Sequence, residues 1–271
     1  MNDLLELMHT RKSVRWYDGN GLKSEDLEKI RNYAEKLDNP FGVPVRFVFL
    51  NAEEKGLSSP VVTGESWYVA GLVPAAPDVE AAYGFSFEKL VLYAWSLGVG
   101  TVWIGGTMDR KLFERTAGKA EEERMPCVTP LGYPAGKRSV KDKLSRKAIG
   151  AESRKAAEEI FFENDFKTPV SAETKEKEAA LIEMILWAPS AVNRQPWRVL
   201  MKDGAWHFYV KHDRGFIQDA TGDLQKIDTG IALCHLFMGL EEAGKTPRTV
   251  VVDPGVETPN GVEYVATVLP E

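Results

Sequence analysis

Two of three notable stretches in this chain combine residue types that suit ligand binding, and the first is the five-residue stretch RKSVR. In an extended backbone, alternate side chains would place Arg11, Ser13 and Arg15 on one side. Two guanidinium groups and a hydroxyl are suited to binding a phosphate. A cluster of basic residues on the surface is the alternative interpretation of the same stretch.

The second stretch is residues 188–197, APSAVNRQPW, between a predicted helix and a predicted strand that Trp197 begins. It holds a hydroxyl at Ser190 and side-chain amides at Asn193 and Gln195. Each amide offers a donor and an acceptor together, which suits the mixed polar edge of a heteroaromatic ring. The alternative is a turn that ends the helix and is capped by its own polar side chains.

The third stretch, residues 239–246 (GLEEAGKT), matches the phosphate-binding loop pattern G-x-x-x-x-G-K-[ST]. That loop needs a strand before it and a helix after it, so that backbone N–H groups face the phosphates. Here an apolar helix precedes it and Pro247 with a β-branched strand follows, and Glu241 and Glu242 would repel a phosphate. The pattern therefore indicates a helix end, with Gly244 just after it.

Other common catalytic arrangements find no support in the sequence. The four histidines have no metal-ligand spacing, and the sequence contains no Gly-x-Ser-x-Gly pattern. Cys127 and Cys234 are far apart and indicate neither a metal site nor a disulfide framework. We expect structural or surface roles for these side chains.

The elements that would position the first two stretches repeat within the chain. Residues 24–50 and 171–201 each predict a helix capped by a serine (Ser24, Ser171), then a loop with proline, then a strand. Residues 87–106 and 228–253 each predict an apolar helix ended by glycine and then a strand. Residues 127–132 and 264–269 predict a closing strand in each half. Two related units in one chain indicate a homodimer fused into a monomer.

Composition limits the possible classes of protein. The 271 residues include 34 basic and 40 acidic side chains, for a net charge of −6. This balance argues against nucleic-acid binding, and residues 136–155, although basic, carry no aromatic side chains between the charges. No apolar run reaches the length needed to span a membrane, and the first residues do not resemble a secretory signal. We expect a cytoplasmic protein.

With these motifs together, the sequence resembles the FMN-dependent nitroreductase superfamily. Members carry an Arg-x-Ser-x-Arg/Lys turn, an Ala-Pro-Ser-x-x-Asn-x-Gln-Pro-Trp loop, a glycine-rich strand and a Gly-Tyr-Pro-Ala segment. Here these read RKSVR (11–15), APSAVNRQPW (188–197), GVGTVWIGG (98–106) and LGYPAGK (131–137). In ordinary members one short chain holds every motif and the flavin lies at a homodimer interface. Here each half of the chain lacks motifs that the other has, so the sequence resembles a fused, two-lobe branch.

The resemblance implies an internally duplicated α+β fold, with mixed β-sheets flanked by helices. It implies a first lobe over residues 1–166 and a second lobe over residues 167–271, with one FMN site between them. Arg11, Lys12, Ser13 and Arg15 would hold the flavin phosphate and ribityl chain, helped by a basic residue at Arg154 or Lys155. The backbone at Gly105 and Gly106 would run past the N5 edge of the flavin. The second lobe would contribute Pro189, Ser190, Ala191, Asn193 and Gln195.

The activity that the resemblance implies is hydride transfer from NAD(P)H through FMN to a small acceptor, such as a nitroaromatic or a quinone. No side chain is expected to act as a catalytic acid or base, because the flavin carries the chemistry. The alternative is a flavin-binding protein without turnover, or a structural relic of the family. No metal, nucleic-acid or membrane partner is expected, and the fused lobes predict a monomer.

Overall fold

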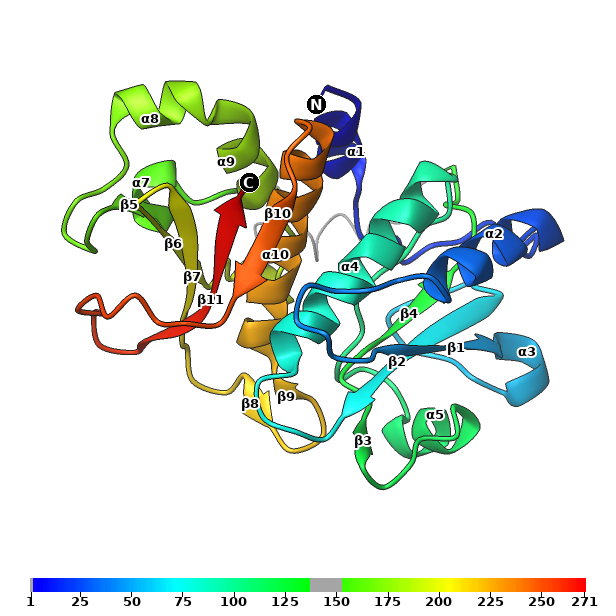
Figure 1. Cartoon of the computed structure of the whole chain (residues 1–271). Helices are drawn as coiled ribbons and strands as arrows, with labels where there is room; N and C mark the ends of the chain where they lie inside the picture. Colours follow the sequence, from blue (N-terminus) through cyan, green and yellow to red (C-terminus); the bar gives the residue numbers. More distant parts are fainter. Residues whose placement is uncertain (1, 137–152) are drawn as a thin grey trace.

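The computed structural model describes residues 2–136 and 153–271, whose two larger β-sheets lie on either side of a pair of long helices (Figure 1). The long helices are α4 (Glu80–Ser96) and α10 (Leu224–Glu242), and they cross in the middle of the molecule. Both helices are buried on nearly all sides, which explains why their sequences are apolar around the whole circumference.

The first half of the chain forms an antiparallel sheet in which β2 pairs with β1, β3 and β4. Its elements, besides α4, are α1 (Asn2–Thr10), α2 (Ser24–Ala34), β1 (Arg46–Asn51), α3 (Ala52–Lys55), β2 (Trp67–Pro74), α5 (Arg110–Thr116), β3 (Glu123–Arg124) and β4 (Val128–Leu131).

The second half forms a five-stranded sheet with the order β10-β11-β7-β6-β5, in which only the β5–β6 pair is parallel. Its elements, besides α10, are α7 (Ala157–Ile160), β5 (Phe161–Glu163), α8 (Ala172–Lys177), α9 (Ala179–Leu186), the 3₁₀ turn η1 (Ala191–Asn193), β6 (Trp197–Lys202), β7 (Ala205–Lys211), β8 (Ile217–Gln218), β9 (Gly222–Asp223), β10 (Pro247–Val250) and β11 (Val262–Pro270). Strands β8 and β9 pair only with each other among the described residues.

The two halves share one pattern of connections. In the first, β1 pairs with β2, α4 follows, and β4 returns to pair with β2. In the second, β6 pairs with β7, α10 follows, and β11 returns to pair with β7. The predicted duplication of an α+β unit is therefore confirmed. One strand crosses between the halves: β5, which precedes residue 166, is hydrogen-bonded to β6 of the second sheet.

Two glycines let the long helices approach each other. A Cβ atom added at Gly84 of α4 would lie 2.0 Å from the backbone oxygen of Ile227, and one added at Gly230 of α10 would lie 2.1 Å from the backbone oxygen of Ala81. Each helix thus contributes a glycine where it meets the backbone of the other. This crossing joins the two halves into a shared apolar core that includes Tyr83 of α4 and Phe237 of α10.

A buried polar contact lies along the same pair of helices. The His235 Nε2 atom is 3.2 Å from the Glu88 Oε1 atom, and both side chains are fully buried. The other nitrogen of His235 lies 2.8 Å from the backbone oxygen of Met184, and the indole of Trp103 donates to Glu88 Oε2 over 3.2 Å. The contact therefore links α4, α10, α9 and the segment that leads to Gly105.

Several boundaries differ from the sequence predictions. Ser24 is the first residue of α2 and does not cap it, because Lys23 occupies the cap position, whereas Ser171 does cap α8 through a 3.2 Å bond from the Thr174 N–H. Helix α4 begins at Glu80, seven residues earlier than residue 87. Residues 98–106 form isolated bridges at Gly100, Thr101 and Ile104 instead of a regular strand. Most of the basic stretch 136–155, namely 137–152, lies outside the described residues.

Candidate functional site

The RKSVR stretch is extended, as the sequence predicts, and runs beside the glycine-rich segment. Ser13 forms a parallel bridge with Thr101, and the Val14 N–H donates to the Thr101 oxygen over 2.8 Å. Val14 is buried, while Ser13 and Arg15 are half-buried. Lys12 lies over the ring of Trp95 on α4, 5.7 Å from its centroid. Backbone hydrogen bonds therefore hold the RKSVR stretch, whose side chains suit a phosphate, beside the segment that contains Gly105 and Gly106.

A stack of side chains brings Arg154 to the end of α1. The Arg154 guanidinium lies 4.4 Å from the ring centroid of Trp187, at the end of α9. The Trp187 ring in turn lies 4.5 Å from the ring of His9, whose Nε2 atom is 3.0 Å from the Glu183 carboxylate. Arg11 follows His9 by two residues and is itself buried, so Arg154 lies near the start of the RKSVR stretch.

The backbone of the 188–197 loop is strained. Val192, Asn193 and Gln195 have φ values of 45°, 58° and 50°, a region that costs non-glycine residues about 1–3 kcal/mol each. Val192 is β-branched and 56% exposed, so packing of its own side chain does not explain the conformation. Strain of this kind persists where the surroundings hold it, and it is concentrated at functional sites.

Hydrogen bonds hold this loop in place. The Ser190 hydroxyl accepts from the Gln195 N–H over 2.9 Å, and the Asn193 amide donates to the Ser153 oxygen over 3.0 Å. The Gln195 side chain is 3% exposed, and its oxygen accepts from the Lys155 N–H over 2.9 Å. Part of the polar set thus caps its own loop, as the alternative interpretation of the sequence states. The same bonds tie the loop to residues 153–155.

Gly105 and Gly106 differ in what surrounds them. A Cβ at Gly105 would lie 3.4 Å from the Cys127 sulfur and 3.8 Å from a methyl group of Leu224, at the start of α10. A Cβ at Gly106 would meet no atom within 4 Å among the described residues. Arg110 donates to the Gly105 oxygen and so fixes this segment. The backbone at Gly106 therefore borders open space, and Gly106 is exposed.

Asp228 connects α10 to the 188–197 loop and was not identified from the sequence. Its two carboxyl oxygens lie 3.1 and 3.0 Å from the Ala191 N–H, and the side chain is buried one turn after Leu224. Burial raises the pKa of the Asp228 carboxyl well above its usual range, and the nearby charge of Asp223 adds to this. The signal available in the sequence was an acid within an otherwise apolar helix. Trp187, which carries the Arg154 contact, was missed as well.

The segments that carry the predicted residues are linked in a ring by contacts and by the close approach of Gly105 to Leu224. From RKSVR the ring passes along residues 98–106 to Leu224 and Asp228, then through Ala191 and the 190–195 loop to residues 153–155, and back through Trp187 to α1. The side chains of Arg154 and Lys155 point in different directions. Arg154 faces Trp187, whereas the Lys155 ammonium lies 3.5 Å from the backbone oxygen of Gln195. Pro189 is half-buried at the start of the loop.

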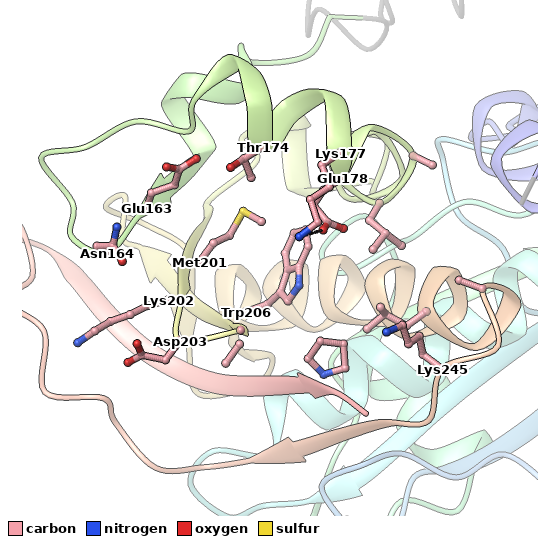
Figure 2. Close-up of a pocket in the computed structure, with 17 residues that line it drawn as sticks. Glu163, Asn164, Thr174, Lys177, Glu178, Met201, Lys202, Asp203, Trp206 and Lys245 are labelled. Atoms are coloured by element: carbon pink, nitrogen blue, oxygen red, sulfur yellow. Dashed lines mark ion pairs between the residues drawn. The ribbon is translucent and has the colours of Figure 1, made fainter.

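The stretch that resembles a phosphate-binding loop lies elsewhere and ends a helix. Helix α10 stops at Glu242, Gly244 has φ 77°, and the Lys245 N–H donates to the Leu240 oxygen over 2.9 Å. The interpretation as a helix end is confirmed. Lys245 lines a hollow of about 590 Å³ bounded by α8, α9, the β6–β7 turn and the ends of α10 and β11 (Figure 2). Its charges balance, with three lysines and three carboxylates: Lys177, Lys202, Lys245, Glu163, Glu178 and Asp203.

The histidines and cysteines have structural surroundings. His207 and His212 contact Thr267 and Glu263, and both cysteines are free and buried. Across residues 2–136 and 153–271, no group of three His, Cys, Asp or Glu side chains is placed to hold a metal ion. In the same residues, no helix combines the length and apolar character needed to cross a bilayer.

Comparison with known structures shows the fold. The chain is similar to a protein of Thermotoga maritima described as a "putative nitroreductase", with 19% identity, a TM-score of 0.63, and coverage of 98% of this chain and 93% of that one. An FMN-dependent nitroreductase of Clostridium difficile aligns with 52% of this chain and 94% of its own, at 16% identity and a TM-score of 0.43. A protein of Bacteroides thetaiotaomicron described as a "Putative NADH dehydrogenase/NAD(P)H nitroreductase" aligns with 51% of this chain and 90% of its own, at 20% identity and a TM-score of 0.44.

No curated protein matches the chain. A family model, described as "Putative TM nitroreductase", matches residues 3–240, which include RKSVR, the glycine pair, Arg154 and the 188–197 loop. Because this match covers most of the chain, the protein belongs to that nitroreductase family.

Proposed function

We propose that this protein is an FMN-dependent oxidoreductase that takes hydride from NAD(P)H and reduces small acceptors such as nitroaromatics or quinones. The observation that carries the proposal is the convergence of RKSVR, Gly105–Gly106, Arg154 and the strained 188–197 loop on one region. These segments come from opposite halves of the chain, as expected if the single site of a fused dimer draws on both lobes, 1–166 and 167–271.

The groups present suit FMN. Arg11 and Arg154 would bind a phosphate with charge-assisted hydrogen bonds, and Ser13 and Arg15 would hold the ribityl chain. The open space beside Gly106 would admit a flat ring against the backbone, where a side chain would obstruct it. Asn193 and the backbone around Ser190 and Ala191 would contact the polar edge of the ring from the second lobe.

The bound flavin would supply the redox chemistry by accepting hydride and passing electrons to an acceptor. The protein would contribute binding, orientation and the exclusion of water. Asp228 would keep the Ala191 end of the loop in position through its contact with the Ala191 N–H. We further propose a cytoplasmic location, where the free thiols of Cys127 and Cys234 would stay reduced.

The purified protein tests the proposal directly. We expect it to be yellow, or to become yellow with added FMN, and to release FMN and not FAD on denaturation, because the proposed site offers a single phosphate-binding end. With FMN bound, we expect steady oxidation of NADPH or NADH in the presence of a quinone. A colourless protein that takes up no added FMN would refute the proposal. Flavin binding without turnover would instead support a non-catalytic flavin-binding protein.

A further inference from the structure

A second cationic region lies beside the 188–197 loop. A hollow of about 350 Å³ opens there, and its charged lining consists of four cations and one carboxylate: Lys155, Arg194, Arg198, Lys211 and Asp213. The carboxylate is already engaged, because Asp213 lies 3.8 Å from the Nε atom of Arg194. The hollow in Figure 2, with equal numbers of lysines and carboxylates, shows that such an imbalance is not general on this half of the chain.

Arg198 is the central residue of the hollow. It is only 8% exposed, and one guanidinium nitrogen donates to the backbone oxygens of Gln195 and Trp197 over 3.2 and 2.6 Å. Within the part of the chain that the structure describes, no carboxylate oxygen lies within 4.0 Å of its nitrogens. A buried guanidinium without a carboxylate partner is costly, and a bound anion would remove that cost.

A bound anion would also stabilise the positive charges next to Arg198. Burial lowers the pKa of Lys155, and the positive charge of Arg198 lowers it further, while burial also lowers the pKa of Arg198. The carboxylates of Glu159 and Asp213 raise both pKa values, but the net shift of each is downward. Lys211 is exposed at the end of β7, and its N–H donates to the Pro196 oxygen over 2.9 Å. Three cations therefore surround a space that an anionic group can enter from solvent.

The position of the hollow suggests which molecule carries the anion. Arg154 faces Trp187 and the end of α1, whereas Lys155 faces the hollow, so the two adjacent residues serve two separate cationic regions. The hollow also connects to the start of α10, because the Asp213 N–H donates to the Gln225 oxygen over 2.6 Å. Leu224, the preceding residue, adjoins Gly105. A nucleotide that binds beside the proposed flavin site would therefore find the hollow on a neighbouring segment.

We propose that the hollow around Arg198, Lys155 and Lys211 binds the 2′-phosphate of NADPH and makes NADPH the preferred hydride donor over NADH. This inference rests on the proposed flavin oxidoreductase function. The chemistry recognised is a phosphomonoester, which FMN and NADPH both carry. If the hollow held the FMN phosphate, substitutions in it would weaken FMN binding. If it holds the 2′-phosphate, substitutions in it would weaken the use of NADPH but not of NADH.

The test compares Lys211→Gln and Arg198→Gln with the control Lys202→Gln, which lies on the same strand as Arg198 and lines the charge-balanced hollow of Figure 2. For the flavin-loaded protein we measure kcat/KM with NADPH and NADH, the affinity for FMN, and calorimetric binding of 2′,5′-ADP and 5′-AMP. We expect the wild type to prefer NADPH and to bind 2′,5′-ADP more tightly than 5′-AMP. Each hollow variant should lower kcat/KM for NADPH by about tenfold to a hundredfold. NADH use and FMN affinity should stay within about twofold, as should all values for Lys202→Gln.

The possible results separate this inference from the proposed function. Equal use of NADPH and NADH by the wild type, with no preference for 2′,5′-ADP, overturns the inference while leaving the flavin proposal intact. Loss of FMN affinity in Lys211→Gln assigns the hollow to the flavin phosphate and also overturns it. A protein that binds no FMN refutes the proposed function, and 2′,5′-ADP binding then still decides whether the hollow recognises the phosphate. Lys211→Gln keeps the test valid if Arg198→Gln disturbs the loop.

Discussion

The strained turn at Val192, Asn193 and Gln195 depends on a small number of supporting groups, of which Asp228 is the most buried. Its carboxyl touches only the Ala191 N–H among the hydrogen-bond partners in the described residues, and no cation lies within ion-pair distance of it there. A protonated carboxyl is therefore the form that the fold favours. The group supports the loop as a neutral acceptor, so an amide can replace it.

We expect Asp228→Asn to keep FMN affinity and to gain stability relative to the wild type as the pH rises. The folded state holds a proton that the unfolded chain releases above its usual pKa of about 4, so the wild type loses stability as the pH rises from there toward the raised pKa of Asp228. The loss approaches about 1.4 kcal/mol per pH unit within that window. Urea unfolding at pH 5 and pH 7.5 measures it. An Asn variant whose relative stability is the same at both pH values would show an ionised Asp228.

Arg11→Ala should weaken FMN binding by about 1.5–3 kcal/mol, which is typical of a hydrogen bond to a charged group. Lys245→Ala, at the end of α10, should leave FMN binding unchanged because Lys245 lines a hollow on another part of the second half. Fluorescence titration of FMN into each variant gives the two affinities. Weaker binding only in Lys245→Ala would reverse the assignment of these two stretches.

At the scale of elements, the α4–α10 crossing positions both sides of the candidate site. Gly84 and Gly230 set how closely the helices approach, and the start of α10 then places Leu224 against Gly105 and Asp228 against Ala191. The Glu88–His235 contact and its bond to Trp103 reinforce the same arrangement.

Gly84→Ala should destabilise the protein, because the new methyl group would meet the backbone oxygen of Ile227, which cannot move aside as a side chain can. Overpacking of this kind costs about 1–3 kcal/mol or more, which outweighs the gain of about 1 kcal/mol in helix propensity. Gly106→Ala is the matched comparison, since its methyl group would enter open space. It should leave thermal unfolding unchanged and weaken FMN binding. Equal melting temperatures for both variants would contradict the close crossing.

The sequence predicts many of these elements but not their mutual placement. Apolar periodicity and glycine stops gave α4, α10 and the duplication, because these signals are local. The RKSVR and 188–197 stretches stood out because their polar groups are dense and interrupted by proline. Asp228, Trp187 and Arg198 did not stand out, since their roles follow from burial and from contacts made across the fold. The capping role of Ser24 was predicted wrongly because serine suits both the cap and the first turn, and only the backbone conformation distinguishes them.

At the scale of the whole molecule, the two halves have the same connections but different motifs. RKSVR and the glycine pair occur only in the first half, and the APSAVNRQPW loop occurs only in the second. If the halves pair as the two subunits of a dimer would, the chain has one complete flavin site and no second one.

We expect one FMN per chain. Flavin absorbance after denaturation, divided by the protein concentration from amino-acid analysis, gives the ratio for protein saturated with FMN and freed of excess. Light scattering on the same sample measures whether the chain is a monomer, as the fused lobes predict. A ratio near two would show that each half forms a site of its own and would refute the shared site.

Helix α1 is made well before α9 and α10, against which it packs. Met8 lies in one cluster with Leu92 of α4 and Met184 of α9, and Met238 of α10 packs against that cluster. On a ribosome that adds about 5–20 residues per second, α10 is synthesised roughly ten seconds or more after α1. Its apolar face is open to chaperones or to other nascent chains during that interval. Complete burial of α1 thus depends on synthesis of most of the second half of the chain.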